Sequence, residues 1–457
     1  MKKYDLIIIG WGKGGKTLAA SLGKQGWKIA LIEKDSLMYG GTCINVGCLP
    51  SKAFAHSAQA LDEVRKLDLA TDYELNNKFY QASLKHKREF VKKLNNKNFS
   101  ILDTLENVDL YLGTASFKDS KVISVQLKDE LIELTGDKII INTGASFRKL
   151  DIKGIENTQG IIYSNQALEL EQLPKEMLVI GAGFIGLEFA NYFNQFGSKV
   201  TVMQHNDSFM PSEDLEDSNY VKELLTKQGI DLKFNTQVLE FKNQNNQVVV
   251  TYKQNDQTYT QTFDNVLIAA GRVPNTQNLN LEAVGIETKN QAIVVNDYLE
   301  TTVKDVYAIG DVKGGPMFTY VSLDDSRILL SNWLNTPKKY TLKDRDLLPW
   351  STFLSPTYAR VGYNEKEATA KNIKYIKKYL PTSGIPKAHV INQTDGFNKI
   401  LINENDEIIG ATLMNYEAHE MINILTLAIK LKLKYQYLRD FIYTHPTFTE
   451  SLNDILK

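Results

Sequence analysis

The chain has 457 residues and carries 53 Lys plus Arg against 54 Asp plus Glu, so its formal net charge is -1. Hydrophobic residues make up 43% of the chain and charged residues 23%, an ordinary globular composition that excludes a disordered or fibrous protein. The charge balance shows no basic excess of the kind that nucleic-acid binding needs, and a basic run at residues 85–97 has the helical spacing of a solvated helix face. At ~100–200 residues per domain, the length indicates two to four domains.

The chain has two cysteines, Cys43 and Cys48, which excludes a disulfide-rich secreted scaffold and a Cys-rich zinc module. The apolar stretch that ends at Gly10 is too short for a membrane span, and no later apolar run reaches ~18 residues. We therefore expect a cytoplasmic protein without a membrane or nucleic-acid partner. In that reducing compartment, a close pair of cysteines is more often redox-active than structural.

The first predicted elements form a unit of strand, glycine-rich turn, helix and strand. Residues 6–9 are an all-apolar run, typical of a strand buried on both faces, and they lead into Gly10-Trp11-Gly12-Lys13-Gly14-Gly15. A helical pattern covers residues 18–25, and an apolar strand at residues 29–32 ends at Glu33. The glycines of such a G-x-G-x-x-G turn bring backbone N–H groups to a pyrophosphate at the helix N-terminus.

The sharpest local signal follows at Gly40-Gly41-Thr42-Cys43-Ile44-Asn45-Val46-Gly47-Cys48-Leu49-Pro50-Ser51-Lys52. The spacing of the two cysteines suits a disulfide that closes a small loop, and the flanking glycines let the backbone pass close to a flat ring system. Such a pair can alternate between disulfide and dithiol, and a helix predicted to begin near Pro50 should favour the thiolate of Cys48. A structural disulfide or a zinc half-site is the alternative, although zinc usually needs four ligands.

The strand, turn, helix and strand unit recurs later in the chain. An apolar strand at residues 178–180 leads into Gly181-Ala182-Gly183-Phe184-Ile185-Gly186, followed by a helix over residues 187–196 and a strand over residues 200–203. Two plain βα turns are the alternative, but both copies have the context that a dinucleotide site requires. Two such sites indicate two redox cofactors, or a cofactor and a substrate nucleotide.

The two copies can be compared position by position. Glu33 lies 23 positions after Gly10, and Gln204 lies 23 positions after Gly181. A carboxylate at Glu33 can accept hydrogen bonds from a ribose 2′-OH and would repel a 2′-phosphate, which suits FAD. Neutral Gln204 does not oppose a 2′-phosphate, and the neighbouring His205 could help to bind one or could be an ordinary loop histidine. We therefore expect the second site to take NADPH at least as well as NADH.

The remaining predicted elements complete the second half of the chain. Strands at residues 247–252 and 266–269 precede a turn at Gly271-Arg272-Val273-Pro274, and an apolar strand at residues 306–309 ends in Gly310-Asp311, at the sheet edge where ligands bind. A domain boundary is predicted near residue 345. Beyond it we expect strands at residues 359–363 and 408–414 and a helix over residues 419–433.

A histidine near the C-terminus stands in the run Thr444-His445-Pro446-Thr447-Phe448-Thr449-Glu450. A lone histidine before proline is more often structural, but a dithiol centre needs a proton donor and acceptor, and a carboxylate can fix the histidine tautomer. The other histidines have no comparable setting. The run His419-Glu420-Met421-Ile422-Asn423 lacks the second histidine of a zinc helix, and we predict no metal site.

Together these motifs resemble those of the class I pyridine nucleotide-disulfide oxidoreductases, the family of glutathione reductase and dihydrolipoyl dehydrogenase. The resemblance runs from Tyr4 to Leu456. It implies an α/β fold with two Rossmann-like dinucleotide-binding domains and a C-terminal α+β dimerisation domain. The domains would be an FAD-binding domain at residues 1–148, an NAD(P)H-binding domain at 149–268, the second part of the FAD-binding domain at 269–345 and a dimerisation domain at 346–457.

The resemblance also implies cofactor contacts. FAD would bind the first glycine turn, Gly310-Asp311 resembles the motif whose aspartate contacts the FAD ribitol, and Thr143-Gly144 resembles the turn that joins the two nucleotide domains. The predicted cofactor-binding residues are Gly10, Gly12, Gly15, Glu33, Gly41, Thr42, Lys52, Thr143, Gly144, Gly181, Gly183, Gly186, Gln204, His205, Gly271, Arg272, Gly310 and Asp311.

By the same resemblance, Cys48 would be the charge-transfer thiolate over the flavin and Cys43 the interchange thiol that attacks the substrate. Lys52 would stand near the flavin N5 and pair with Glu188. His445, oriented by Glu450, would come from the other subunit, so the active enzyme would be a homodimer.

Departures from the patterns of related enzymes reduce the number of candidate substrates. The chain ends at residues 451–457 without the cysteine pair of mercuric reductases and large thioredoxin reductases, and Tyr443 stands where dihydrolipoyl dehydrogenases commonly have a second histidine. Several stretches resemble the bacterial reactive-chlorine-resistance flavoproteins, understood as hypothiocyanous acid reductases. These stretches are residues 10–18, 38–45, 318–325, 419–424 and 451–454.

The resemblance thus predicts that NAD(P)H, FAD and the Cys43–Cys48 disulfide reduce hypothiocyanous acid and protect the cell from reactive oxidants. Cys43 would attack the electrophilic sulfur, releasing thiocyanate or hydroxide according to which bond breaks, and Cys48 would resolve the adduct. Reduction of glutathione disulfide, coenzyme A disulfide or lipoamide stays open, as does reduction of metal ions such as Cu(II). A non-enzymatic redox sensor is a further alternative.

Overall fold

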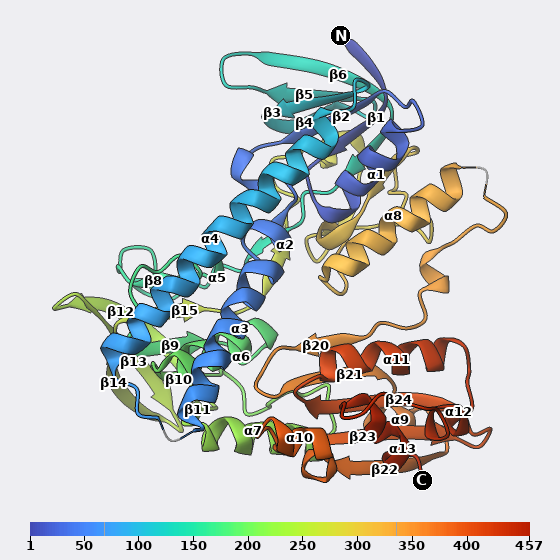
Figure 1. The fold of residues 1–457 in the computed structure, drawn as a ribbon. Helices are drawn as coiled ribbons and strands as arrows, with labels where there is room; N and C mark the ends of the chain where they lie inside the picture. The colour runs from blue at the N-terminus through green and yellow to red at the C-terminus, as the bar shows by residue number, and fades with distance from the viewer. Residues whose placement is uncertain (68, 335) are drawn as a thin grey trace. The chain divides into compact units, whose positions relative to one another are not determined.

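The computed structural model describes residues 1–67, 69–334 and 336–457 (Figure 1). The chain divides into two compact units, each built from separate stretches of sequence. Unit 1 comprises residues 1–53, 83–149 and 270–345, and unit 2 comprises residues 54–82, 150–269 and 346–457. The finer division into four domains stays a prediction.

Unit 1 is organised around a mixed sheet of strand order β3-β2-β1-β6-β5-β4, with β19 also paired to β6. Neighbouring strands among β3, β2, β1, β6 and β19 run parallel, whereas β4, β5 and β6 are antiparallel neighbours. The strands are β1 (Lys2–Ile9), β2 (Ile29–Glu33), β3 (Val108–Leu112), β4 (Thr114–Asp119), β5 (Val122–Gln126), β6 (Leu131–Ile141) and β19 (Val306–Ala308). Two short pairs accompany it, β7 (Ala145–Phe147) with β16 (Arg272–Pro274) and β17 (Thr288–Lys289) with β18 (Ala292–Ile293).

Both faces of this sheet are buried, as the apolar run at residues 6–9 predicts. Ile7 and Ile9 join one hydrophobic cluster, and Leu6 and Ile8 join another. The helix α1 (Lys13–Gly23) packs against α8 (Thr319–Trp333), and both helices contribute side chains to the hydrophobic cluster that contains Leu6 and Ile8 (Figure 1). The further helices α2 (Thr42–Asn45), α3 (Cys48–Arg65) and α4 (Tyr73–Asp103) follow β2, and the first two boundaries between the two units along the chain fall inside α3 and α4.

Unit 2 contains a parallel sheet, an antiparallel three-strand sheet and a C-terminal antiparallel sheet. The parallel sheet has the order β11-β10-β9-β15-β8, with β8 (Ile161–Ile162), β9 (Glu176–Ile180), β10 (Lys199–Met203), β11 (Asp231–Lys233) and β15 (Asn265–Ile268). Its companion sheet is β12 (Thr236–Gln244), β13 (Gln247–Gln254) and β14 (Gln257–Phe263). The helices of this part are α5 (Ser164–Ala167), α6 (Phe184–Phe196) and α7 (Leu215–Lys227).

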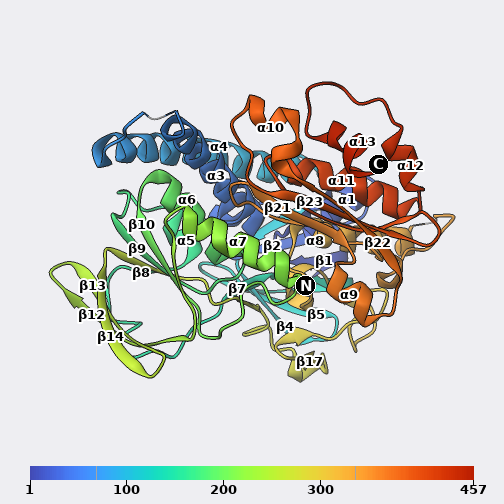
Figure 2. The same ribbon diagram turned by 90° about the horizontal axis from the view of Figure 1, so that it is seen from below.

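The C-terminal sheet has the order β20-β21-β24-β23-β22, and α11 packs on β21 and β24 (Figure 1). Figure 2 shows β21, β22, β23 and α11 from a second direction. Its strands are β20 (Trp350–Thr352), β21 (Thr357–Gly362), β22 (Tyr375–Pro381), β23 (Phe397–Asn403) and β24 (Ile408–Asn415). The helices are α9 (Glu365–Ala370), α10 (Pro386–Val390), α11 (Ala418–Lys430), α12 (Tyr435–Arg439) and α13 (Leu452–Ile455). Leu413, Met421 and Leu425 lie in the hydrophobic core between the sheet and α11.

A buried charge cluster within unit 2 centres on Lys399, whose side chain is 1% exposed. Its ammonium lies 2.6 Å from Asp214, 2.8 Å from Asp217 and 3.2 Å from Glu365. Burial raises the pKa of Asp217 to about 6, although the charge of Lys399 acts in the opposite direction. The cluster therefore joins β23 to α7 and α9 through charges.

Most predicted elements are confirmed, and one expectation is wrong. The helix predicted to begin near Pro50 is present and begins two residues earlier, at Cys48. Residues 272–274, predicted to be a turn, form the strand β16. The basic run at residues 85–97 lies on the helix α4, and its basic side chains are exposed as expected, except that Lys87 is 1% exposed. Among the described residues, no helix combines the length and the apolar character needed to cross a membrane.

Candidate active site

The first glycine turn is shaped by a residue that the motif does not contain. Gly10 has φ 99° and leads the chain from β1 toward α1. Asn142 lies under the turn: its Oδ1 accepts the N–H of Gly15 at 2.9 Å, and its Nδ2 donates to the carbonyl of Ile309 at 3.0 Å. A Cβ on Gly12 would lie 2.5 Å from Asn142 Oδ1, so a larger residue does not fit there. Asn142 therefore fixes the turn that the sequence motif predicts.

Glu33 stands at the end of β2, next to this turn. Its Oε2 accepts the N–H of Trp11 at 2.9 Å, and its Oε1 accepts the N–H of Lys34 at 2.8 Å. Burial raises the pKa of Glu33, and the donated backbone hydrogen bonds oppose that effect. The carboxylate is thus held at the carboxyl edge of the sheet, where an adenosine ribose binds in folds of this kind.

The second glycine turn repeats the first in detail. Gly181 has φ 108°, and a Cβ on Gly186 would lie 1.9 Å from the carbonyl oxygen of Gly181. Gln204 Oε1 accepts the N–H of Ala182 at 3.0 Å, as Glu33 accepts that of Trp11. No described heavy atom outside the immediate chain lies within 4 Å of a Cβ placed on Gly183, so the start of α6 faces open space.

The Gly310-Asp311 motif follows β19 and begins a short 3-10 helix at Gly310–Lys313. The buried carboxylate of Asp325 accepts the N–H of Gly310 at 2.7 Å, and Arg345 Nη2 lies 2.6 Å from the other oxygen of Asp325. Burial raises the pKa of Asp311, and the positive charge of Arg272 opposes that effect. Sequence reasoning missed Asp325 and Arg345, which hold the motif in place from distant positions in the chain.

The turn at Thr143-Gly144 is tied to a later segment of unit 1. Thr143 Oγ1 donates to the carbonyl of Asn275 at 2.7 Å, and Asn275 Nδ2 donates to the carbonyl of Thr143 at 2.9 Å. Gly144 has φ 71°, and its carbonyl accepts the N–H of Asn275 at 2.9 Å. Arg272, just after Gly271, hydrogen-bonds the Ala145 carbonyl and lies 5.3 Å over the Phe147 ring.

Each of the two cysteines lies at the start of a helix, Cys43 in the short helix α2 and Cys48 in the long helix α3. Cys43 is in the first turn of α2, and Cys48 is the first residue of α3. The two cysteines are not joined by a disulfide bond, Cys43 hydrogen-bonds Cys48, and Cys48 Sγ lies 3.4 Å from Thr319 Oγ1. A Cβ on Gly41 would lie 3.0 Å from the Cα of Gly12, so the cysteine loop packs directly on the first glycine turn.

The cysteine pair is electrostatically coupled. The hydrogen bond with Cys48, burial and the charge of Cys48 raise the pKa of Cys43 well above its ordinary value. Thr319 and Lys16 act in the opposite direction. Cys48 is the first residue of α3, and a helix N-terminus is a position that favours a thiolate.

Two asparagines of α4 hold the cysteine loop, and sequence reasoning missed both. Asn95 Nδ2 donates to Asn45 Oδ1 at 3.0 Å and to the carbonyl of Leu37 at 3.0 Å. Asn98 packs against the loop, because a Cβ on Gly40 would lie 3.0 Å from Asn98 Cγ. No local sequence signal marks these residues, since their partners in the loop lie 50 or more positions away.

Lys52 and Glu188, the predicted pair, belong to different units. Lys52 is half-buried in the second turn of α3. Glu188 is buried on α6, and its Oε1 accepts the N–H of Phe353 at 2.9 Å within unit 2. Their mutual contact stays a prediction.

His445 and Glu450 lie together in the loop before α13. His445 Nδ1 lies 2.8 Å from Glu450 Oε2, and Glu450 Oε1 accepts the N–H of Thr447 at 2.9 Å. Burial acts to raise the pKa of Glu450, but Thr447 and His445 outweigh it and hold the pKa below its ordinary value. The His445 side chain is 71% exposed, so its ring faces solvent with one nitrogen fixed by a carboxylate.

The residues present fit FAD at the first glycine turn and a nicotinamide dinucleotide at the second. Gly12 and Gly183, the N-cap residues of α1 and α6, have no side chain that could cap these helices. In α1, Ser322 Oγ and Asn142 Oδ1 accept the N–H groups of Gly14 and Gly15. Among the described residues, the start of α6 has no such side-chain cap at Gly183 and is open to an anion. Glu33 offers a carboxylate for a ribose and Gln204 an amide. The structure places His205 beside Gln204, where it is exposed.

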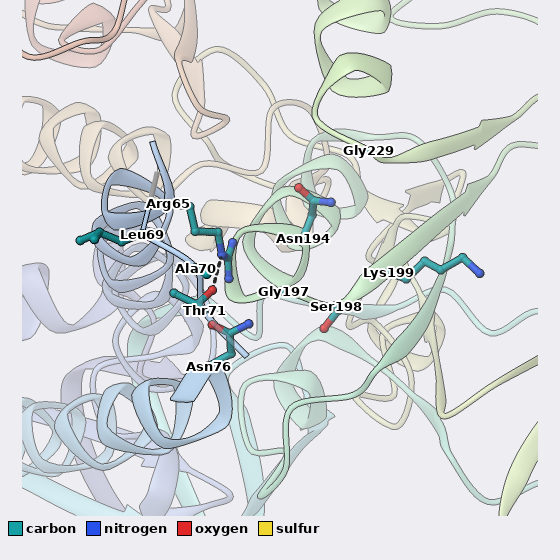
Figure 3. Close-up of a pocket in the computed structure, with 10 residues that line it drawn as sticks. All are labelled: Arg65, Leu69, Ala70, Thr71, Asn76, Asn194, Gly197, Ser198, Lys199 and Gly229. Carbon is teal, nitrogen blue, oxygen red and sulfur yellow. Dashed lines mark hydrogen bonds between the residues drawn. The ribbon is translucent and has the colours of Figure 1, made fainter. Parts of the chain in front are cut away.

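A pocket of about 690 Å³ lies elsewhere in unit 2 (Figure 3). It is lined by the end of α3, the segment before α4 and the end of α6, and Arg65 Nη1 donates there to the carbonyl of Gln195 at 2.6 Å. Arg65 thus satisfies a carbonyl at the C-terminus of α6. The pocket contains neither cysteine nor a residue of either glycine turn. Within the described residues, no group of three or more His, Cys, Asp or Glu could hold a metal ion.

Comparison with known proteins decides the family. The profile of pyridine nucleotide-disulphide oxidoreductases matches residues 4–326, and the profile of the dimerisation domain of these proteins matches residues 348–455. The chain belongs to the pyridine nucleotide-disulfide oxidoreductase family. FAD and NAD(P)H are the cofactors of this family, and its fold is that of glutathione reductase, as the sequence resemblance implies.

Several relatives match the chain over almost its full length. The probable pyridine nucleotide-disulfide oxidoreductase RclA of Escherichia coli is 40% identical over 100% of this chain and 99% of its own. The mercuric reductase of Staphylococcus aureus is 31% identical over 98% of this chain and 81% of its own. The dihydrolipoyl dehydrogenase 3 of Pseudomonas putida is 32% identical over 99% of this chain and 97% of its own.

Solved structures agree with these relatives. A Cu(II) complex of the HOCl-induced flavoprotein disulfide reductase RclA from Escherichia coli has a TM-score of 0.92 and 39% identity, and it covers 100% of this chain and 99% of that chain. A second structure of the HOCl-induced flavoprotein disulfide reductase RclA from Escherichia coli has a TM-score of 0.91 and 39% identity, and it covers 99% of this chain and 99% of that chain. This chain is therefore a flavoprotein disulfide oxidoreductase of the RclA type.

Proposed function

We propose that the protein reduces hypothiocyanous acid with electrons from NADPH, through FAD and the Cys43–Cys48 pair. The observation that carries the proposal is the hydrogen-bonded dithiol on a loop packed against the first glycine turn. The full-length likeness to RclA, a reactive-chlorine type of flavoprotein, supports an oxidant as substrate.

The chain's cysteine count supports a small electrophile rather than a bound metal or a protein disulfide. Cys43 and Cys48 are the two cysteines of the chain, so no further thiol can relay electrons to a distant substrate. A small oxidant needs little recognition beyond access to the attacking sulfur. Cys43 is half-buried, which leaves part of its side chain accessible.

The reaction at the pair balances as a two-electron reduction. The Cys43 thiolate attacks the sulfur of hypothiocyanous acid, an S–S bond forms, the S–O bond breaks, and hydroxide leaves and takes up a proton as water. The Cys48 thiolate then attacks the Cys43 sulfur, the disulfide forms, and thiocyanate leaves. The pair is oxidised by two electrons and the oxidant is reduced by two.

The remaining residues bind, orient and move protons. Bound FAD supplies the passage of two electrons from the nicotinamide to the disulfide. Lys52 and Glu188 would orient one another beside the flavin. His445 of the partner subunit would take the proton of Cys43 and give one to the leaving hydroxide, while Glu450 holds its Nδ1.

A homodimer would complete the site. The dimerisation profile covers residues 348–455, and large apolar side chains are exposed in its last part, most of all Ile442 at 92%. The exposed apolar residues there are Leu427, Leu431, Tyr437, Phe441 and Ile442. A second copy would bury them, since an exposed apolar patch of this kind marks an interaction site. We expect the dimer to work in the cytoplasm, where NADPH and reduced thiols prevail.

The experiment is to follow NADPH consumption by the purified flavoprotein with hypothiocyanous acid, glutathione disulfide, coenzyme A disulfide or lipoamide. Rapid consumption with hypothiocyanous acid alone is the expected result. Rapid consumption with a disulfide and none with hypothiocyanous acid would contradict the substrate but not the family. Cysteines that titrate without turnover would instead indicate a redox sensor.

Cu(II) is the second candidate substrate, because a solved structure with a TM-score of 0.92 to this chain is a Cu(II) complex. The same assay with Cu(II) and a Cu(I)-specific chelator tests it. Formation of Cu(I) that depends on NADPH and on Cys43 would favour metal reduction.

A further inference from the structure

Lys16 is a charged residue that the first glycine motif does not require. It directly follows Gly15 and lies in the first turn of α1, and its side chain is half-buried. Its ammonium donates a hydrogen bond to Asn98 Oδ1 on α4. Holding a long cationic side chain in one half-buried position costs rotamer entropy and hydration, so we look for an interaction that offsets this cost.

Asn98 links Lys16 to the cysteine loop. A Cβ on Gly40 would lie 3.0 Å from Asn98 Cγ, and a Cβ on Gly41 would lie 3.0 Å from the Cα of Gly12. The start of α1, the end of α4 and the residues just before Cys43 are therefore packed together. Lys16 and Cys43 thus lie on segments that are in direct contact, and their charges act on one another.

The charges in this cluster act on one another. Burial and, to a smaller extent, the neighbouring charge of Lys13 lower the pKa of Lys16 to about 8, although the charge of the Cys43 thiolate acts to raise it. The groups that face Cys43 are Cys48, Thr319 and Lys16. Of these, Cys48 opposes a charge on Cys43, while Thr319 and Lys16 favour it.

We propose that Lys16 is a positioning residue that keeps a positive charge beside Cys43, so that this thiol can become the reactive thiolate next to an already charged Cys48. Two interacting thiols lose their protons in separate steps, and the second loss is the harder one. A fixed cation reduces that difficulty. The inference deepens the proposed function, since it rests on Cys43 as the thiol that attacks the substrate.

The test measures the reactivity of Cys43 directly. In the flavin-loaded Cys48→Ser variant, Cys43 is the remaining thiol of the chain, so alkylation by iodoacetamide reports on it alone. Iodoacetamide is neutral, so a lysine cannot attract it by charge. The rate of alkylation as a function of pH gives the pH at which Cys43 ionises.

Adding Lys16→Met to this variant should slow alkylation at pH 7 by about tenfold, which corresponds to a shift of about one pH unit in the profile. Lys16→Arg should restore most of the rate, because it keeps the charge. The matched control is Lys24→Met, which removes an exposed lysine from the other end of α1. It should leave the profile unchanged.

An unchanged profile in Lys16→Met, or an Arg variant as slow as the Met variant, would overturn the proposal. If Lys16→Met does not retain flavin, Lys16→Gln replaces it, because Gln can still donate to Asn98. Neither NADPH nor an oxidant takes part in this measurement. A failure of the substrate assignment and a failure of the Lys16 proposal are therefore separate outcomes.

Discussion

Gln204 Oε1 accepts the backbone N–H of Ala182 at 3.0 Å, in the position where the first nucleotide unit uses a carboxylate. There, Glu33 Oε2 accepts the N–H of Trp11 at 2.9 Å. The two side chains therefore make the same hydrogen bond, each to the backbone N–H of the residue that follows the first glycine of its turn. They differ in charge, and that difference bears on which nucleotide each turn accepts.

The Gln204→Glu substitution should change nucleotide preference without disturbing the turn. The new carboxylate can still accept the N–H of Ala182, as Glu33 does for Trp11, but it would repel a 2′-phosphate. We expect kcat/KM for NADPH to fall by about tenfold or more, and that for NADH to hold or rise. Steady-state kinetics with both nucleotides measure the change.

The companion variant His205→Ala distinguishes the contribution of His205 from that of Gln204. His205 is exposed, and its removal tests whether the imidazole helps to bind a 2′-phosphate. Wild-type enzyme with equal or better kcat/KM for NADH would contradict the NADPH preference.

Cys43→Ser should abolish turnover while FAD stays bound. The pair then lacks the thiol that attacks the substrate, and Cys48 alone cannot close a disulfide. Turnover is followed by NADPH consumption, and bound flavin by its absorbance after gel filtration. Retained turnover in this variant would disprove the proposed chemistry.

A heterodimer of two inactive chains should recover activity if His445 serves the partner subunit. One chain carries Cys43→Ser and the other His445→Ala, and differently tagged copies are coexpressed and the mixed dimer isolated. It would contain one site with Cys43 and His445 both intact, so about half of the wild-type rate is expected. A mixed dimer as inactive as either parent would show that His445 does not act across an interface.

Asn142→Ala should weaken the first nucleotide unit. The N–H of Gly15 and the carbonyl of Ile309 would both lose a buried partner, at about 1–3 kcal/mol for each unsatisfied group. The midpoint of thermal unfolding and the flavin content should both fall. Asn405→Ala, at an exposed position in unit 2, is the control and should change neither.

The charge cluster of unit 2 predicts opposite effects for its cation and one of its acids. Lys399→Met leaves Asp214, Asp217 and Glu365 without their shared cation and should destabilise the protein by about 3–5 kcal/mol. Asp217→Asn should be stabilising above pH 6. Folding raises the pKa of Asp217 from 3.8 to about 6, so ionised Asp217 costs stability.

That cost is absent below pH 3.8, grows as the pH rises and is complete above pH 6. The Asp217→Asn variant should therefore melt above wild type at pH 8 and lose this advantage near pH 4. Thermal unfolding at several pH values makes the comparison. An advantage that is independent of pH would contradict the ionisation account.

The strands and glycine turns could be predicted because their signals are local. The apolar run at residues 6–9 is a strand buried on both faces, and the two glycine turns lead into α1 and α6 as expected. The helix boundary at Cys48 differs from the prediction because Pro50 sits in the first turn of α3, where proline is tolerated. The pattern therefore marked the helix but not its first residue.

The residues that hold the site could not be predicted, because their partners are distant in sequence. Asn142 lies 127 positions from Gly15, and Asn95 lies 50 positions from Asn45. Lys87 carries a charge in a basic run, and nothing in that run shows that tertiary packing buries it. Polar residues of this kind acquire their role only when the fold brings their partners to them.

The two thiols of this chain lie side by side on one loop, and the sequence contains no others. These two cysteines are therefore the thiols of the chain that an electrophilic oxidant can modify. A disulfide bond to another protein would likewise have to use Cys43 or Cys48. Irreversible oxidation would have to compete with closure of the disulfide, a reaction whose partner is already in contact. The protein would then be inactivated when the reductant is exhausted, and the presence of the oxidant alone would not be enough.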